Sequence, residues 1–248
     1  MTGSDITNLA FQVGAFQVDG TKVKGNLKAI GGSLAGRVDV QLVSRSPFGT
    51  TGNGEAMGPV RFGADGAFEF TDVQPGVYDL KVIGNSAKDA PKPEFFIASV
   101  MMEGQDVSDS GISVPEGTAS VTVSAAVDFS PGTITGKTFD SQNRPLPGAN
   151  LVLMSADSKK RLLDPYWKEI KSDREGAFRM GSLAPGDYLL MIWPGYRPWA
   201  GLDPEEFAIL EKHAVRVTVG RSSTVSQNLQ LTKEVRDMLD ALSPAGVP

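Results

Sequence analysis

The sequence predicts an all-β protein made of two tandem seven-stranded β-sandwiches of the immunoglobulin-like type, with one or two short helices. One segment of the chain occurs twice at a constant offset of 110 residues, as from Phe68 to Phe178. Within both copies apolar and polar residues alternate, which is the period of a half-buried strand. Gly and Pro, 28 and 16 of 248 residues, exceed their usual share of about 12% and favour short strands joined by tight turns.

Each copy of the repeat has the same internal order of strand, connector, Pro-Gly turn and strand. Proline restricts φ at the first corner of a turn, and glycine accepts the positive φ that the second corner of a type II turn requires. The pairs Pro75-Gly76 and Pro185-Gly186 therefore predict type II turns. The residues interpreted as the structural motif are Gly66, Phe68, Pro75, Gly76 and Tyr78 in the first copy, and Gly176, Phe178, Pro185, Gly186 and Tyr188 in the second.

The remaining elements are predicted from local patterns. An Asp followed by Pro, an acidic first turn and a basic end predict a helix at 203–212, and a weaker helix is expected at 233–242. Further strands are predicted by alternating or β-branched runs. They cover 38–43, 95–100 and 121–123 in the first copy, and 149–154, 215–219 and 225–231 in the second.

The offset divides the chain into four parts. We expect sandwich domains at 21–129 and 130–232, with the boundary near Asp128-Phe129-Ser130-Pro131-Gly132, and a short helix with a tail at 233–248. Residues 1–20 contain the strand-like run Leu9–Val13. This run is either the remnant of an upstream repeat or a donor strand for another subunit.

Composition excludes several classes of function. With 24 Lys and Arg against 29 Asp and Glu and a net charge of −5, the chain offers no basic patch for nucleic acid. Zero Cys and the single His213 exclude disulfides, thiolate metal sites and any site of two imidazoles. We therefore expect no catalytic residues, no metal and no cofactor. His213 is interpreted as a cation at a helix C-terminus.

Four carboxylates are the nearest approach to a calcium ligand set. They are Asp106, Asp109, Asp173 and Glu175, and they lack the compact Asp-x-Asp-x-Asp-Gly spacing of a calcium loop. Asp side chains often accept hydrogen bonds from backbone N–H groups two residues further on. Turn capping is the favoured interpretation.

Aromatic residues gather in the second copy, where Trp193, Tyr196 and Trp199 lie within seven residues beside Arg197. Exposed rings on a stiff loop would bind a sugar by stacking, with Arg197 as a hydrogen-bond donor. Alternatively the rings cap the sandwich core, because large aromatic side chains are mostly buried. The second interpretation is favoured.

At these residues the sequence resembles the carboxypeptidase regulatory-like domain, a prealbumin-like β-sandwich grouped with carbohydrate-binding-like folds. The second copy carries the pattern through Gly136, Asp140, Pro145, Pro147-Gly148-Ala149, Ser172-Asp173, Gly176, Phe178 and Leu183-x-Pro185-Gly186-x-Tyr188. The first copy departs from it, with Gly63 at the place of Asp173. The stretches 104–111 and 193–219 resemble segments of large secreted or envelope proteins that carry such domains in tandem.

The resemblance implies a non-enzymatic structural or interaction protein, one segment of a tandem array or surface assembly. Its partners would be proteins, or further copies meeting at edge strands, and the location would be periplasmic, cell-surface or secreted, with the leader outside this sequence. The sequence contains no run of about 18 apolar residues, the length that would predict a membrane-spanning helix. The alternative is a carbohydrate-binding accessory module that contacts polysaccharide through the 193–199 loop. Since one fold serves many functions, the resemblance predicts fold more sharply than function.

Overall fold

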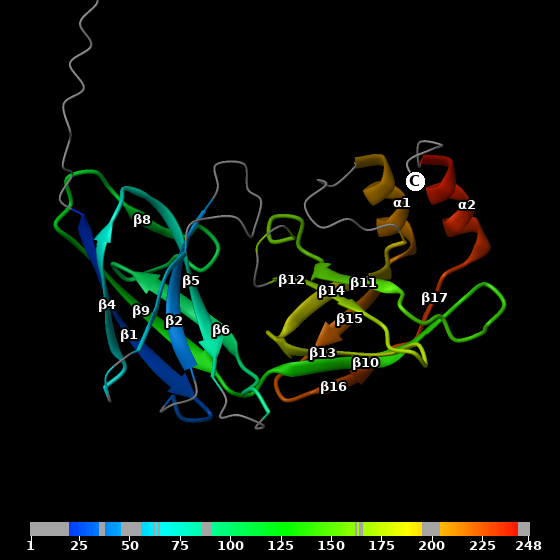
Figure 1. Ribbon diagram of the computed structural model, residues 1–248, viewed down its shortest axis with the longest axis horizontal. Coiled ribbons are helices and arrows are strands. Elements are labelled where there is room, and N and C mark those ends of the chain that lie inside the picture. Colours follow the sequence, from blue (N-terminus) through cyan, green and yellow to red (C-terminus); the bar gives the residue numbers. More distant parts are fainter. Residues whose placement is uncertain are drawn as a thin grey trace, which may run out of the picture.

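The computed structural model describes residues 20–34, 38–45, 56–61, 63, 65–85, 91–161, 163, 166–194 and 204–242. Figure 1 shows two β-sandwiches side by side, with two helices beside the second. Every strand pairing in the described ranges lies on one side of residue 130. We call residues 20–129 the N-terminal sandwich and residues 130–242 the C-terminal sandwich. Their independence as folding domains, with the predicted boundaries, stays a prediction.

The N-terminal sandwich packs a five-stranded sheet on a four-stranded sheet. Its central strands run parallel, Lys22 beside Ser120 through to Ile30 beside Asp128. The first sheet has the order β4 (Ala67–Val73), β1 (Thr21–Ile30), β9 (Ser120–Asp128), β6 (Phe96–Met102) and β7 (Gln105–Asp106). The second has the order β3 (Ala56–Val60), β2 (Val38–Ser44), β5 (Gly76–Gly84) and β8 (Ile112–Val114).

The C-terminal sandwich repeats this plan with two sheets of four strands. The first has the order β13 (Ala177–Leu183), β10 (Gly132–Phe139) and β16 (Thr224–Ser226), with β17 (Leu229–Gln230) also on β10. The second has the order β12 (Trp167–Lys171), β11 (Asn150–Ser155), β14 (Gly186–Ile192) and β15 (Val215–Val219). Helix α1 (Pro204–His213) contacts β14 and α2 (Lys233–Leu242).

Strand pairing makes the two sandwiches topological equivalents. The pairs β1–β4, β2–β5, β5–β8 and β1–β9 match β10–β13, β11–β14, β14–β15 and β10–β16/β17. Since β16 and β17 both lie on β10, they form one interrupted strand, and the C-terminal sandwich has the predicted seven. The N-terminal sandwich has two more in its described part, because the β6–β7 hairpin is inserted where the C-terminal sandwich inserts α1. The all-β class and both helices are confirmed.

The repeat extends to backbone details that an alternating pattern does not reveal. Val23 faces Phe70 and Gly25 faces Phe68, as Ile134 faces Met180 and Gly136 faces Phe178, with a bulge at the same place in both pairs. A Cβ on Gly25 would lie 2.0 Å from the Phe68 ring. A Cβ on Gly136 would lie 2.9 Å from the ring of Phe178 and 1.8 Å from the Gln227 oxygen. Only glycine fits where the backbone approaches this closely.

The predicted type II turns are wrong in one respect. Gly76 and Gly186 begin strands β5 and β14 and do not have positive φ. The left-handed residues lie earlier, at Asp72 and Ser182, with φ of 59° and 55°. These residues lie next to the strand ends at Val73 and Leu183 and redirect the chain before the proline, so the following glycine can be extended.

Each sandwich has its own hydrophobic core, and the repeated tyrosine is buried in it. Tyr78 and Tyr188 are buried, and their hydroxyls donate to the carbonyl oxygens of Gln74 and Ala184, each at 2.8 Å. The bond satisfies a phenol that the core would otherwise leave unpaired. The strand-like run Leu9–Val13 lies outside the described residues.

Candidate site at the junction of the two sandwiches

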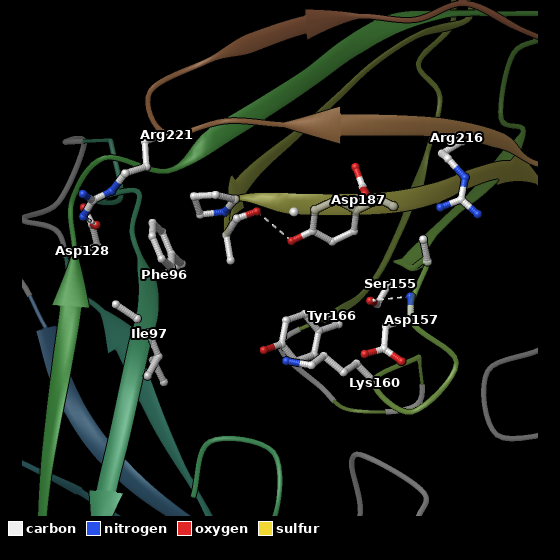
Figure 2. Close-up of a pocket in the computed structure, with 16 residues that line it drawn as sticks. Phe96, Ile97, Asp128, Ser155, Asp157, Lys160, Tyr166, Asp187, Arg216 and Arg221 are labelled. Atoms are coloured by element: carbon white, nitrogen blue, oxygen red, sulfur yellow. Dashed lines mark hydrogen bonds and ion pairs between the residues drawn. The ribbon is translucent and has the colours of Figure 1, made fainter. Parts of the chain in front are cut away.

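The linker between the sandwiches is fixed by hydrogen bonds on both sides. Asp128, at the end of β9, accepts from the Ser130 backbone N–H at 2.9 Å, and the Ser130 carbonyl accepts from the Ser222 N–H at 3.0 Å. The other Asp128 oxygen forms an ion pair with Arg221 (Figure 2). The Asp128 side chain is fully buried, where a carboxylate is tolerated only with such partners.

A second ion pair crosses the junction between Glu94 and Arg179. The guanidinium donates to both carboxylate oxygens, at 2.5 and 2.8 Å. Hydrogen bonding from Arg179 holds the pKa of Glu94 below its usual value of 4.5. A bidentate pair of this kind fixes orientation as well as distance.

A third contact joins the loop after β7 to the loop before β12. Asp109 accepts from Lys160 at 2.8 Å and from the Tyr166 hydroxyl at 3.2 Å. The ammonium of Lys160 also lies 5.1 Å from the centre of the Tyr166 ring. On the N-terminal side Arg45 donates to the Asp109 carbonyl at 2.9 Å while paired with Asp79. Through Arg45 and Asp79, the Asp109 contact is therefore connected to strand β5 of the N-terminal sandwich.

Two cavities lie along the junction. Cavity 1, of about 670 Å³, has Phe96 and Ile97 of β6 on one side, and Asp157, Asp187 and Arg216 on the other (Figure 2). Cavity 2, of about 850 Å³, reaches the N-terminal core. Both are lined by Phe96, Ile97, Tyr166 and Ala184. Phe96 and Ile97 of β6 therefore line both cavities.

Local sequence patterns did not predict this junction. Asp109 was considered only as a turn or calcium residue, and Asp128 only as part of the boundary. Arg179 and Glu94 are 85 residues apart, and Arg221 and Asp128 are 93 apart. No motif links residues at such separations, and only the docking of two sandwiches brings them together.

At Trp193, the first member of the aromatic cluster, the favoured interpretation of a ring packed on the core is confirmed, and the alternative of a sugar-stacking ring is wrong. Trp193 is 2% exposed and packs against Trp167, with ring centres 6.3 Å apart. A buried ring has no face on which a sugar could stack. Tyr196, Arg197 and Trp199 lie outside the described residues, so the 193–199 platform keeps no described member on the surface.

The other candidates have structural partners. Asp106 accepts from the Ser108 N–H at 2.9 Å and Asp173 from the Glu175 N–H at 2.8 Å, as the capping interpretation predicted. In the N-terminal copy Asp65 replaces Asp173 as the cap, accepting from the Ala67 N–H at 3.0 Å. In the described part of the chain no group of three or more His, Asp or Glu could hold a metal ion. His213 is the exposed last residue of α1.

Fold and junction define a tandem β-sandwich protein with a repeated prealbumin-like plan. Residues 133–232 match the family model of the carboxypeptidase regulatory-like domain. The matched segment runs from β10 to β17 and covers less than half of the chain. The residues that carried the resemblance in the sequence are those of its strands and turns.

Solved structures with similar architecture include the Bacillus anthracis TIE protein, a streptococcal ancillary pilin and the minor pilin GBS52 of Streptococcus agalactiae. Their sequence identities are 14%, 20% and 14%, and their TM-scores are 0.31, 0.30 and 0.33. The matches cover 86%, 84% and 92% of this chain, and 34%, 62% and 99% of the respective proteins. The chain thus spans about a third of the first protein and under two thirds of the second. No curated protein matches the sequence. Neither helix in the described ranges is long and apolar enough to cross a membrane.

Proposed function

We propose that the chain is a non-enzymatic structural and interaction protein that works outside the cytoplasm as a segment of a tandem β-sandwich array or surface assembly. The observation that supports this most directly is the junction. Three separate contacts and a hydrogen-bonded linker hold the sandwiches in one relative orientation. A spacer with a set angle transmits position along an assembly, which a flexible linker does not.

The strength of the junction comes from the combination of its contacts. An exposed ion pair contributes about 0–1 kcal/mol on its own. Here one carboxylate is fully buried, one pair is bidentate and one is anchored through Arg45. Ion pairs that are buried, bidentate or anchored by a further partner stabilise more than isolated exposed pairs. Neighbouring domains otherwise move freely unless their interface is large and apolar.

The location is supported by the resemblance of 104–111 and 193–219 to segments of secreted and envelope proteins. Protease added to intact cells that make the protein should cleave it if it is exposed at the surface. Cleavage only after lysis of all membranes would contradict this part of the proposal.

The fixed orientation is tested by distance measurement between two spin labels. The chain has no Cys, so Lys22→Cys and Glu234→Cys place labels at two exposed positions, one in each sandwich. We expect a single narrow distance distribution. Arg179→Gln together with Arg221→Gln should broaden it several-fold.

The matched control is Lys24→Gln. Lys24 pairs with Glu69 within the N-terminal sandwich, at 4.0 Å, so its loss should leave the distribution narrow. A broad distance distribution in the labelled protein that keeps Arg179 and Arg221 would overturn the proposal of a rigid spacer.

A further inference from the structure

The outer edge of β6 is incompletely paired. On its inner side β6 pairs with β9 along its whole length, with a bulge between Ile97 and Ser99. On its outer side β7 pairs only with Met101 and Met102, and Val100 is bonded to Val107 and Ser108. Among the described residues no strand pairs with the outer side of Phe96–Ser99. A free edge of this kind is a template for an added strand.

The two cavities lie where the side chains of an added strand would go. Side chains alternate between the two faces of a sheet. Cavity 2 reaches core residues such as Val100, Val107 and Ile112, and Ile83, Phe95 and Trp167 add to its apolar lining. Cavity 1 contacts Phe96, Ile97, Ala98 and Asp128 of the N-terminal sandwich and is bordered by charged groups of the other. An entering strand should therefore alternate between apolar and polar or small residues.

The charge around cavity 2 also selects its occupant. Four basic side chains line it against two acidic ones, although the whole chain has a net charge of −5. The basic residues are Lys81, Lys92, Lys168 and Arg179, and the acidic ones are Asp79 and Glu94. A strand with acidic and no basic residues on either side of it in the chain would be attracted to this rim.

Residues 1–19, which lie outside the described ranges, have this composition. They contain Asp5 and Asp19 and no Lys or Arg. Leu9, Phe11 and Val13 alternate with Ala10 and Gln12, the apolar and small or polar alternation that the cavities require. No other segment is needed to supply the strand.

The geometry of the sheet favours a second copy over the same chain. Thr21 lies one residue before Lys22, which pairs with Ser120, whereas Phe96 pairs with Asp128 at the other end of β9. The near end of the free edge, at Ser99, which pairs with Ala126, is about 23 Å along the strands and three strand spacings, about 14 Å, across the sheet from Thr21. The eight residues from Val13 to Thr21 span at most about 29 Å when fully extended. A direct line to that end, about 27 Å long, would pass through the protein. The detour around the sheet is longer than the reach of eight residues, so residues 9–13 of the same chain are not expected to reach their own β6 edge.

We propose that residues 9–13 of a second copy of this chain add as a strand to the free edge of β6 at Phe96–Ser99. Leu9, Phe11 and Val13 then face cavity 2, and Ala10 and Gln12 face cavity 1. Each copy is thus donor and acceptor, and copies join head to tail. This inference rests on the proposed function as an assembly segment and names the contact through which it assembles.

The test uses two single-cysteine variants of the full chain, Gln12→Cys as donor and Ala98→Cys as acceptor. Ala98 is exposed. A short bis-maleimide should cross-link an equimolar mixture into a heterodimer. We expect a yield at least ten-fold above that of Gln12→Cys with Thr71→Cys, which places the thiol at an exposed position of another edge strand, β4. A peptide of residues 5–18 should compete, and a scrambled peptide of equal composition should not.

Three results would overturn the proposal. One is equal cross-linking at Ala98→Cys and Thr71→Cys. Another is an internal cross-link in a dilute chain carrying both Gln12→Cys and Ala98→Cys, which would assign the strand to the same copy. The third is unchanged self-association, measured by light scattering, after deletion of residues 1–19. The label-distance experiment does not involve residues 1–19, so the rigid-spacer proposal can hold while this contact fails.

Discussion

Arg179 donates to both carboxylate oxygens of Glu94, at 2.5 and 2.8 Å, and so joins β13 of the C-terminal sandwich to the segment before β6. Arg179 lies opposite Thr135 in the β10–β13 ladder and also contacts the Thr133 hydroxyl at 3.3 Å. The repeat places Glu69 at the equivalent position of β4, where it pairs with Lys22 and Lys24. At this strand position, Glu69 of the first copy forms ion pairs within its own sandwich, whereas Arg179 of the second copy forms an ion pair across the junction.

Acid should open the junction before it unfolds the sandwiches. The hydrogen bond from Arg179 lowers the pKa of Glu94 in the folded protein. Its contribution is complete above the unfolded value of about 4.5 and is lost as the pH falls through the lower folded pKa. We expect the label distance to broaden below about pH 4.5 while circular dichroism stays native. Glu94→Gln removes the titrating carboxylate, so its label distance should be broadened already at neutral pH. Loss of the narrow distance and of the native circular dichroism at the same pH in the unsubstituted protein would contradict the prediction.

Two glycines of the second repeat should respond differently to alanine. Gly176 has a φ of 75°, and a Cβ there would lie 2.8 Å from the Thr138 carbonyl oxygen. Gly186 lacks positive φ, and its nearest contact would be 3.7 Å from the Tyr188 ring. Urea unfolding should show a loss of about 1–3 kcal/mol for Gly176→Ala and less than about 0.5 kcal/mol for Gly186→Ala.

The first repeat provides the matched pair Gly66→Ala and Gly76→Ala. A Cβ on Gly66 would lie 2.1 Å from the Leu27 oxygen, and one on Gly76 would lie 3.4 Å from the Tyr78 ring. The order of the losses should be the same. A larger loss of stability for Gly186→Ala than for Gly176→Ala, or for Gly76→Ala than for Gly66→Ala, would contradict the prediction. It would indicate that the glycine after the proline has a positive φ.

The buried phenol of Tyr188 should be visible in both stability and titration. Tyr188→Phe removes the bond to the Ala184 oxygen and should cost about 1 kcal/mol. Burial raises the pKa of Tyr188 to about 12. The variant should therefore lose one phenol that ionises near pH 12 in an ultraviolet absorbance titration. If the phenol lost from the curve instead ionised near pH 10, the usual value of tyrosine, the burial of this hydroxyl would be contradicted.

Removal of the Arg221 charge should leave a buried carboxylate without its ion-pair partner. We expect Arg221→Gln to destabilise the full chain by about 1–3 kcal/mol, the range for losing a hydrogen bond to a charged group. Asp128→Asn added to Arg221→Gln should recover part of that loss, because an amide costs less to bury than a carboxylate. Additive losses in this double-mutant cycle, measured by urea unfolding, would show that the two side chains do not interact.

Residues 20–129 and 130–242 should each fold when produced separately. Each range contains its own core cluster, and no strand pairing in the described ranges crosses between them. Cooperative urea transitions and native circular dichroism for both pieces are the expected result. A piece that stays unfolded alone would make the junction part of its core and contradict the predicted domain boundaries.

The strands were predictable because their signals are local. The alternation around Phe68 and Phe178, the offset of 110 residues and the capping pattern of α1 depend on residues a few positions apart or on repetition. The backbone at Asp72 and Ser182 was not predictable, because non-glycine residues enter the left-handed region only when the surrounding fold requires it. Strand β6 was predicted at 95–100, but its hairpin with β7 was not, and its place in the sheet could not be predicted because it depends on pairing with β9.

The sequence by itself determined the all-β class, the two-fold repeat, the two helices and the absence of cysteine chemistry. Only the tertiary structure decided that Trp193 is buried and that no strand of the described part pairs with the outer side of Phe96–Ser99. It also decided that Glu94, Asp109 and Asp128 meet Arg179, Lys160 and Arg221. The reason is physical. Periodicity records which face of one strand is apolar, whereas a junction forms between side chains that are distant in sequence and become neighbours only after both sandwiches have folded and docked.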